Sequence, residues 1–216
     1  MKRNFTLMLL SLFLIAPLEA YASWQLIKDE DAIQVYSGKL QGTRIKSAKG
    51  EVTIAASLDE ILAVLENIQL LPRWLYKCKS AKTIKQVDIV ERYDYIYSDM
   101  PWPSWDRDVI VRSVFQQNPD TKVVTVSFDT NPTMVALKQR VVRVKQMTGR
   151  MVLTPQTKKL ANNQSAKSTK VIYEVNADPG GKIPKWLVND MISDFPFYSL
   201  KNLRALVMSR KVNETH

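Results

Sequence analysis

Histidine is the residue type that this sequence most nearly lacks. His216, the last of 216 residues, is the only one. A Ser-His-Asp triad, a Cys-His pair and a histidine-based metal site all need an internal histidine. Glycine is also scarce, with 6 residues, and no Walker loop or G-x-G-x-x-G motif occurs. We therefore predict no cofactor, no metal site and no histidine-based catalysis.

Cysteine is equally scarce. Cys78 is the only one, so no disulfide can form within the chain, and an apolar core has to supply its stability. A single thiol in an exported protein is either reactive or a small buried apolar residue, and we expect the second for Cys78. A chain without disulfides also suits a bacterial periplasm.

Long apolar runs are confined to the N-terminus. Residues 5–16 (FTLMLLSLFLIA) follow a positively charged start, and Ala20-Tyr21-Ala22 matches an A-x-A cleavage site. The run is too short for a comfortable membrane span. We predict a cleaved signal peptide over residues 1–22 and a soluble periplasmic or secreted protein, with an uncleaved anchor as the alternative.

Composition indicates one basic domain. Removing Lys2, Arg3 and Glu19 with the signal peptide changes the formal net charge from +10 to +9. No linker divides the rest of the chain, so we predict a domain over residues 23–210 and a tail over 211–216. Because the charge is dispersed and no nucleic-acid motif is present, we do not expect nucleic acid as a partner.

Alternating apolar and polar residues predict a sheet-rich chain. The predicted strands cover residues 33–37, 44–54, 89–98, 107–117, 122–130, 139–156 and 168–175. Residues 157–169 are polar and basic and indicate a long hairpin tip. Gly50 indicates a bulge in its strand.

Helices are predicted in two places, with a mixed helix and loop over residues 71–85. Ser57 and Glu60 form a capping box at the start of the first helix. The last helix covers residues 183–209, and Pro196 should kink it or divide it in two. Because such a helix must bury its apolar stripe against a curved sheet, the sequence predicts an α+β fold.

Three motifs, in order along the chain, resemble START domains of the helix-grip superfamily. They are DAIQVYSGK (31–39, with Ala32 where Gly is usual), PSWDRDVIVR (103–112) and VNADPGGKIPKWLVN (175–189). The resemblance implies a curved antiparallel sheet wrapped around a long C-terminal helix, with an internal apolar cavity. It further implies binding, and intermembrane transfer, of one lipid, sterol or other hydrophobic molecule by a monomer.

The resemblance also implies where the ligand binds. We expect the cavity wall to include Ile96, Ile110, Val126, Val142, Met191 and Phe195. Met134 and Leu137, in the loop 130–139, would form a lid; the alternative is that they tuck into the core. In sterol-binding members an acidic residue falls on Asp94, but the matching arginine position falls on Ser113, with Arg112 one residue away on the opposite strand face.

Two alternatives to a carrier stay open. Cyclases and aromatases of the wider superfamily need a positioned acid or base, for which Asp94, Asp108, Tyr95 and Arg112 are the candidates. An Arg107–Asp108 pair at the start of a strand is, however, more often a structural ion pair. We expect no catalytic residues.

Membrane docking is the other alternative. Trp102 and Trp105 stand in a Pro-rich loop, and indole rings favour the membrane interface. The basic hairpin tip carries Lys158, Lys159, Lys167 and Lys170. With the positive net charge, it would attract anionic head groups by about 1 kcal/mol per residue near the surface. We expect transient contact with an anionic membrane.

Overall fold

A computed structural model of the chain describes residues 24–39, 46–159 and 165–214. The predicted signal peptide over residues 1–22 lies outside these ranges. No helix within them is long and apolar enough to cross a bilayer.

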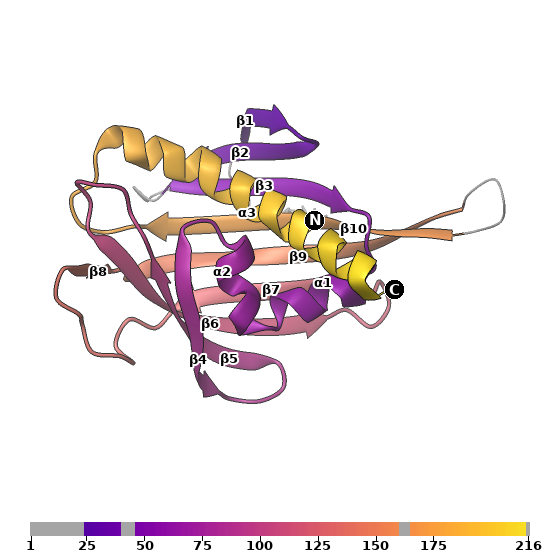
Figure 1. The fold of residues 1–216 in the computed structure, drawn as a ribbon, viewed down its shortest axis with the longest axis horizontal. Helices are drawn as coiled ribbons and strands as arrows, with labels where there is room; N and C mark the ends of the chain where they lie inside the picture. The colour runs from indigo at the N-terminus through magenta and orange to yellow at the C-terminus, as the bar shows by residue number, and fades with distance from the viewer. Residues whose placement is uncertain (1–23, 40–45, 160–164, 215–216) are drawn as a thin grey trace, which may run out of the picture.

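Ten strands form one curved antiparallel sheet (Figure 1). They are β1 (Gln25–Glu30), β2 (Ile33–Lys39), β3 (Lys46–Ile54), β4 (Cys78–Gln86), β5 (Glu91–Ser98), β6 (Asp106–Gln117), β7 (Val124–Thr130), β8 (Val141–Arg143), β9 (Gln146–Lys159) and β10 (Ser165–Asp178). The order across the sheet is β1-β2-β3-β10-β9-β7-β6-β5-β4. The short β8 lies off this path and pairs with β6 in parallel.

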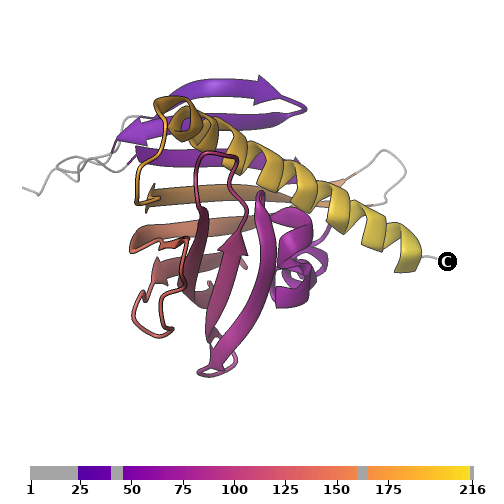
Figure 2. The ribbon, with the colours of Figure 1, turned by 60° about the vertical axis from the view of Figure 1, so that its left-hand side comes forward.

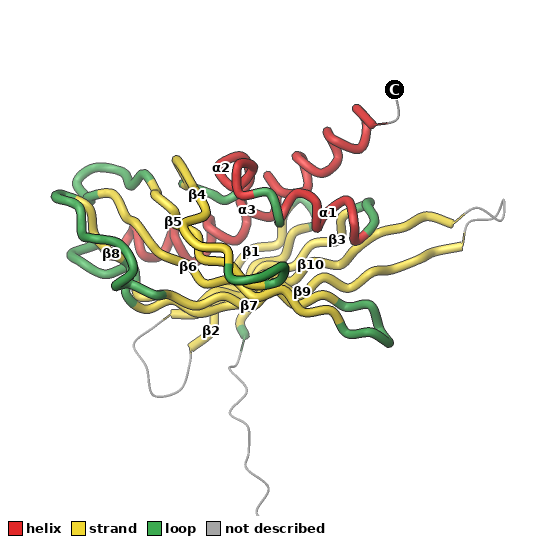
Figure 3. Tube along the Cα trace, turned by 90° about the horizontal axis from the view of Figure 1, so that it is seen from below, coloured by secondary structure: helices red, strands yellow, loops and turns green. Residues whose placement is uncertain are grey.

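The helices all lie on the concave face of the sheet (Figure 3). They are α1 (Leu58–Leu65), the short 3₁₀ turn η1 (Ile68–Leu70), α2 (Leu71–Trp74) and the long α3 (Lys185–Glu214). The capping box of α1 is confirmed: the Ser57 backbone N–H donates to Glu60 at 2.6 Å, and the Ser57 hydroxyl accepts from the Glu60 backbone N–H. These elements confirm the helix-grip fold.

The two halves of α3 differ in how deeply their side chains are buried. In the second half, Phe197, Leu200, Leu203, Leu206 and Val207 are buried in the apolar core. In the first half, Met191 and Phe195 are only half-buried. Figure 2 shows α3 crossing the strands diagonally.

Several predictions about these elements differ from the structure. Pro196 was expected to kink the last helix or to divide it; division is excluded, because α3 is continuous from Lys185 to Glu214, and the kink stays a prediction. The segment 71–85 contains β4 in addition to the short α2. Gly50 is not a bulge, since its pairing with Val35 and Tyr173 is in regular register.

Gly50 instead lets α3 approach the sheet closely. A Cβ atom there would lie 2.6 Å from Leu200 Cδ1 and 3.1 Å from Pro196 Cβ. These distances are shorter than carbon atoms tolerate. The absence of a side chain at this position therefore fixes the height at which the middle of α3 crosses β3.

Candidate functional site

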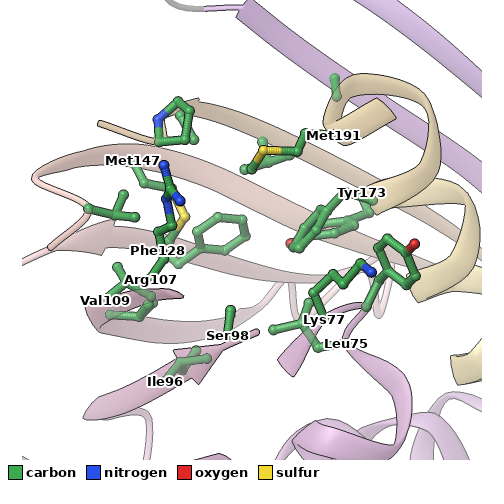
Figure 4. Close-up of a pocket in the computed structure, with 18 of the residues that line it drawn as sticks. Leu75, Lys77, Ile96, Ser98, Arg107, Val109, Phe128, Met147, Tyr173 and Met191 are labelled. Atoms are coloured by element: carbon green, nitrogen blue, oxygen red, sulfur yellow. The ribbon is translucent and has the colours of Figure 1, made fainter. Parts of the chain in front are cut away.

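A cavity of about 480 Å³ lies between α3 and the concave face of the sheet. Its walls are mostly apolar and aromatic, and Figure 4 shows side chains from β5, β6, β9, β10 and α3 converging on it. Such a volume is within the range of about 300–1,000 Å³ that small-molecule sites have. Phe128, Met151 and Tyr173 form its floor from the central strands. Burial raises the pKa of the Tyr173 hydroxyl, which stays protonated.

The register of β5 against β6 decides which residues face this cavity. Asp94 is opposite Val111, and Ile96 is opposite Val109. Directly opposed residues share a face of the sheet, and all four line the cavity. Of the residues predicted from the sequence, Asp94, Ile96, Val126, Met191 and Phe195 lie on its wall.

Other predicted residues lie elsewhere. Ile110 is opposite Tyr95 and Arg112 is opposite Tyr93, which puts both on the convex face. Arg112 pairs there with Glu91 through two hydrogen bonds of 2.8 and 3.0 Å. Neighbouring residues of a strand point to opposite faces, so Val109 and Val111 on the cavity wall place Ile110, which lies between them, on the other face.

Val142 was wrongly placed on the wall: it packs under the turn at Gly180 and Gly181 and does not line the cavity. Met134 and Leu137 are 38% and 70% exposed, so they do not tuck into the core and do not line the cavity in this structure. Their role as a lid stays a prediction.

A buried ion pair lies on the cavity wall. Asp94, 3% exposed, accepts hydrogen bonds from Arg92 Nε at 2.8 Å and from Thr83 Oγ1 at 2.7 Å. Arg92 also donates to the backbone carbonyls of Leu65 and Glu66, which ties α1 to β5. Arg92 was not predicted. It lies directly opposite Ser113, the position at which sterol-binding START domains carry an arginine, so its guanidinium approaches Asp94 from the neighbouring strand.

A second buried pair holds the loop between β7 and β8. Arg143 donates to both carboxylate oxygens of Asp108, at 2.6 and 3.0 Å, and Tyr95 donates to the same group at 2.9 Å. Arg143 also donates to the carbonyls of Pro132 and Val135 at 2.6 and 3.0 Å. The hydrogen bonds that Asp108 accepts from the Arg143 guanidinium raise the pKa of that guanidinium.

The expected ion pair between Arg107 and Asp108 was therefore wrong. The two adjacent side chains point to opposite faces of β6, as strand geometry requires. Asp108 pairs with Arg143, while Arg107 rises into the cavity wall beside Met147 and Phe128 (Figure 4). Arg107 is 4% exposed, and desolvation lowers the pKa of its guanidinium.

The cavity reaches the surface between three segments, which we call the mouth. They are the α2–β4 turn with Lys77, the β5–β6 loop with Met100 and Pro101, and the start of α3 with Trp186. The last strand turns into α3 through Asp178-Pro179-Gly180-Gly181. Both glycines have φ of +65°, and Asp178 Oδ1 accepts from the Gly180 N–H at 2.9 Å.

Two of the three mouth segments carry exposed tryptophans. Trp102 is 89% exposed and Trp105 is 60% exposed, both in the β5–β6 loop, and Trp186 is 51% exposed. Within the described part of the chain, no group of three or more His, Cys, Asp and Glu side chains is placed to hold a metal ion.

The sequence is similar to known proteins over most of its length. The START domain family pattern matches residues 9–211 of the chain. An uncharacterised protein from Pseudomonas aeruginosa is 32% identical over 187 residues, which cover 87% of this chain and 88% of that protein.

Solved structures are similar as well. A STAR-related lipid transfer protein from Xanthomonas axonopodis superposes with a TM-score of 0.74 at 29% identity, covering 86% of this chain and 98% of that one. Human STARD10 superposes with a TM-score of 0.70 at 17% identity, covering 89% of this chain and 76% of that one, which bears on the fold alone. With the helix-grip fold and its apolar cavity, these matches show that the chain belongs to the START domain family.

Proposed function

We propose that the protein binds one hydrophobic molecule in this cavity and carries it between membranes outside the cytoplasm, after cleavage behind Ala22. The observation that supports this most is the cavity itself, which is closed by α3 and lined mainly by apolar side chains. Family membership supports a hydrophobic ligand. One chain supplies the whole cavity, so we expect a monomer to be sufficient.

Burial of the ligand supplies its own driving force. Each methylene group moved out of water contributes about 0.8 kcal/mol, so ten of them contribute about 8 kcal/mol. That figure corresponds to a dissociation constant of about 1 μM before the cost of ordering the ligand is subtracted. Affinity for a lipid therefore requires only a few polar contacts.

The mouth is suited to membrane docking. Trp102, Trp105 and Trp186 present indole rings beside the opening, and such rings favour the membrane interface. Lys77 and Lys182 are exposed in the same segments and would attract anionic head groups. Docking at this end would bring the opening against the bilayer, where a lipid can enter without crossing water.

The two carboxylates that the sequence offered as acid–base candidates, Asp94 and Asp108, are unsuited to that chemistry. Both oxygens of Asp94 accept hydrogen bonds, from Thr83 and Arg92, and those of Asp108 are taken by Arg143 and Tyr95. A general acid or base must exchange a proton with its substrate. We therefore propose that these groups position elements of the fold and that the cavity binds without catalysis.

Charge placed on the cavity wall tests the proposal. Met191→Glu introduces a carboxylate at the wall, whereas Ala205→Glu introduces one on the exposed side of the same helix. Native mass spectrometry of the exported protein should show a stoichiometric lipid on the wild type and on Ala205→Glu, and none on Met191→Glu. Equal lipid content in all three proteins would contradict a ligand in this cavity.

Transfer needs a separate measurement. Movement of a fluorescent lipid between vesicles containing anionic phosphatidylglycerol should slow in the Trp102→Ala, Trp105→Ala double variant, while binding of the same lipid in solution stays unchanged. If the double variant transfers at the wild-type rate, this loop is not the docking surface.

A further inference from the structure

Arg107 differs from Arg92, which is half-buried on the cavity wall, and from Arg143, which is buried on the other face of β6. Arg92 pairs with Asp94 and Arg143 pairs with Asp108, so both have a carboxylate partner. Among the described residues, no carboxylate oxygen lies within 4.0 Å of the Arg107 guanidinium, although the side chain is only 4% exposed. Burying a charge without a counter-charge is costly. Arg92 and Arg143 each have a carboxylate that offsets this desolvation cost, whereas the buried charge of Arg107 has no carboxylate in contact among the described residues.

The guanidinium is held in place but not satisfied. Its Nη1 donates to the carbonyl of Trp105, and its Nη2 donates to the carbonyl of Gly180 at 3.2 Å. These two acceptors belong to two segments of the mouth. An arginine has five N–H donors, and Nε is buried with no acceptor among the described residues. The remaining donors are therefore available to a group that enters from the cavity.

The neighbouring carboxylates cannot turn towards Arg107 without breaking other bonds. Asp106 accepts from the Tyr97 hydroxyl at 2.5 Å and from the Met100 backbone N–H at 3.0 Å. Asp108 is bound by Arg143 on the opposite face of the sheet. The charge of Asp106 acts on Arg107 from a distance, but no carboxylate of the described residues forms an ion pair with it, so the guanidinium can still bind an anionic group.

The dimensions of the cavity match one extended chain. On the concave face of β6, the six residue steps from Arg107 to Ser113 span about 20 Å at about 3.4 Å per step. The 480 Å³ volume spread over this length gives an average width of about 5 Å, close to the spacing of neighbouring extended chains.

We propose that Arg107 binds the anionic head group of the cargo, and that the cargo is a single-chain amphiphile that ends in a carboxylate or a phosphate. The planar guanidinium matches both groups in shape and charge. The head lies at the mouth beside Gly180, and the chain lies along β6 over Phe128 and Tyr173. The assignment of Arg107 rests on the proposed function, because it names the ligand class of the same cavity.

A second donor on the wall agrees with a cargo that carries acceptor oxygens. The indole Nε1 of Trp74 is buried with no acceptor in the described part of the chain, and Trp74 also lines the cavity. Like the guanidinium, an indole N–H can only donate. A pure hydrocarbon would leave both donors unpaired.

The test compares ligands that share one chain and differ in the head group. Isothermal titration calorimetry would measure hexadecanoate, hexadecyl phosphate and neutral hexadecanol against the wild type, Arg107→Met, Arg107→Lys and Arg112→Met. Arg112 is the matched control, since it lies on the same strand but faces outward. Hydrogen bonds to charged groups predict that the wild type prefers an anionic ligand over the alcohol by about 10- to 100-fold.

The expected result is that Arg107→Met removes this preference, that Arg107→Lys keeps part of it, and that Arg112→Met leaves it unchanged. Equal binding of acid and alcohol by the wild type would overturn the role of Arg107 while the hydrophobic carrier stands, and this readout needs no variant. Binding of none of the three ligands would contradict the proposed function itself. Inorganic phosphate that binds alone, without competing with the lipids, would assign Arg107 to a free anion instead of the cargo.

Discussion

Replacing Arg143 with methionine should destabilise the protein strongly, although no ligand is involved. The change removes five hydrogen bonds: two to Asp108, at 2.6 and 3.0 Å, and three to the carbonyls of Pro132, Val135 and Ala136. The loop carbonyls can turn to water, but Asp108 is 1% exposed and cannot. It keeps a single hydrogen bond, from the Tyr95 hydroxyl at 2.9 Å.

The expected loss follows from the carboxylate left behind. Removing one partner of a buried ion pair costs about 3–5 kcal/mol, whereas an exposed pair contributes about 0–1 kcal/mol. Arg150→Met is the matched control, because Arg150 pairs with Glu174 at a similar distance of 2.8 Å but on the surface. A domain has only about 5–15 kcal/mol of stability in total, so Arg143→Met should lie near the limit of folding.

Urea unfolding followed by circular dichroism measures the difference. The double variant Arg143→Met, Asp108→Leu removes the unpaired buried carboxylate and should recover most of the roughly 3–5 kcal/mol that the single variant loses. Trypsin should also cleave the loop next to Lys138 and Arg140 faster in the single variant, because its anchor is gone. A loss below about 1 kcal/mol, or a double variant no more stable than the single one, would refute this reasoning.

Three further predictions concern other parts of the molecule. Gly50→Ala should lower the free energy of unfolding by about 1–3 kcal/mol, because its Cβ would collide with Leu200; a melting temperature equal to that of the wild type would contradict the contact. Burial raises the pKa of the Cys78 thiol to about 11, from 9.0. At pH 8 the thiolate fraction is therefore about 100-fold lower than in an exposed thiol, and iodoacetamide should label Cys78 only after urea unfolding. The intact mass of the exported protein should correspond to a chain that starts at Ser23, and a mass that includes residues 1–22 would argue for an uncleaved anchor.

Local signals in the sequence predicted local structure well. The capping box at Ser57 and Glu60 and the turn at Gly180 and Gly181 form as expected, because each depends on a few neighbouring residues. The positions of most strands along the chain and the long last helix also followed from periodicity and from the START-like motifs, although β1 and β4 were missed. Gly50 was misinterpreted, because a glycine is needed there to make room for Leu200 of α3, which is about 150 residues away in the chain.

The wall of the cavity was predicted only in part. Ile96 and Ile110 are both apolar residues in strands, but pairing across β5 and β6 puts them on opposite faces. That register depends on the exact length of the loop between the strands, which composition does not reveal. The same pairing explains why Arg92 replaces the arginine expected at Ser113, and it could have been inferred only once the strands were aligned.

The contrast between the two halves of α3 has a consequence for the cargo. The second half rests on Gly50 and on core side chains, whereas the first half is separated from the sheet by the cavity. In the proposed carrier, a bound hydrophobic molecule would occupy the place that side chains occupy further along the helix, and it would complete the protein's interior. Loading should raise the unfolding temperature with ligand concentration, as binding to the native state alone requires. Delivery, if the protein transfers its ligand as proposed, would amount to exchanging a piece of the hydrophobic core, while the part of the core that the sequence itself encodes stays in place.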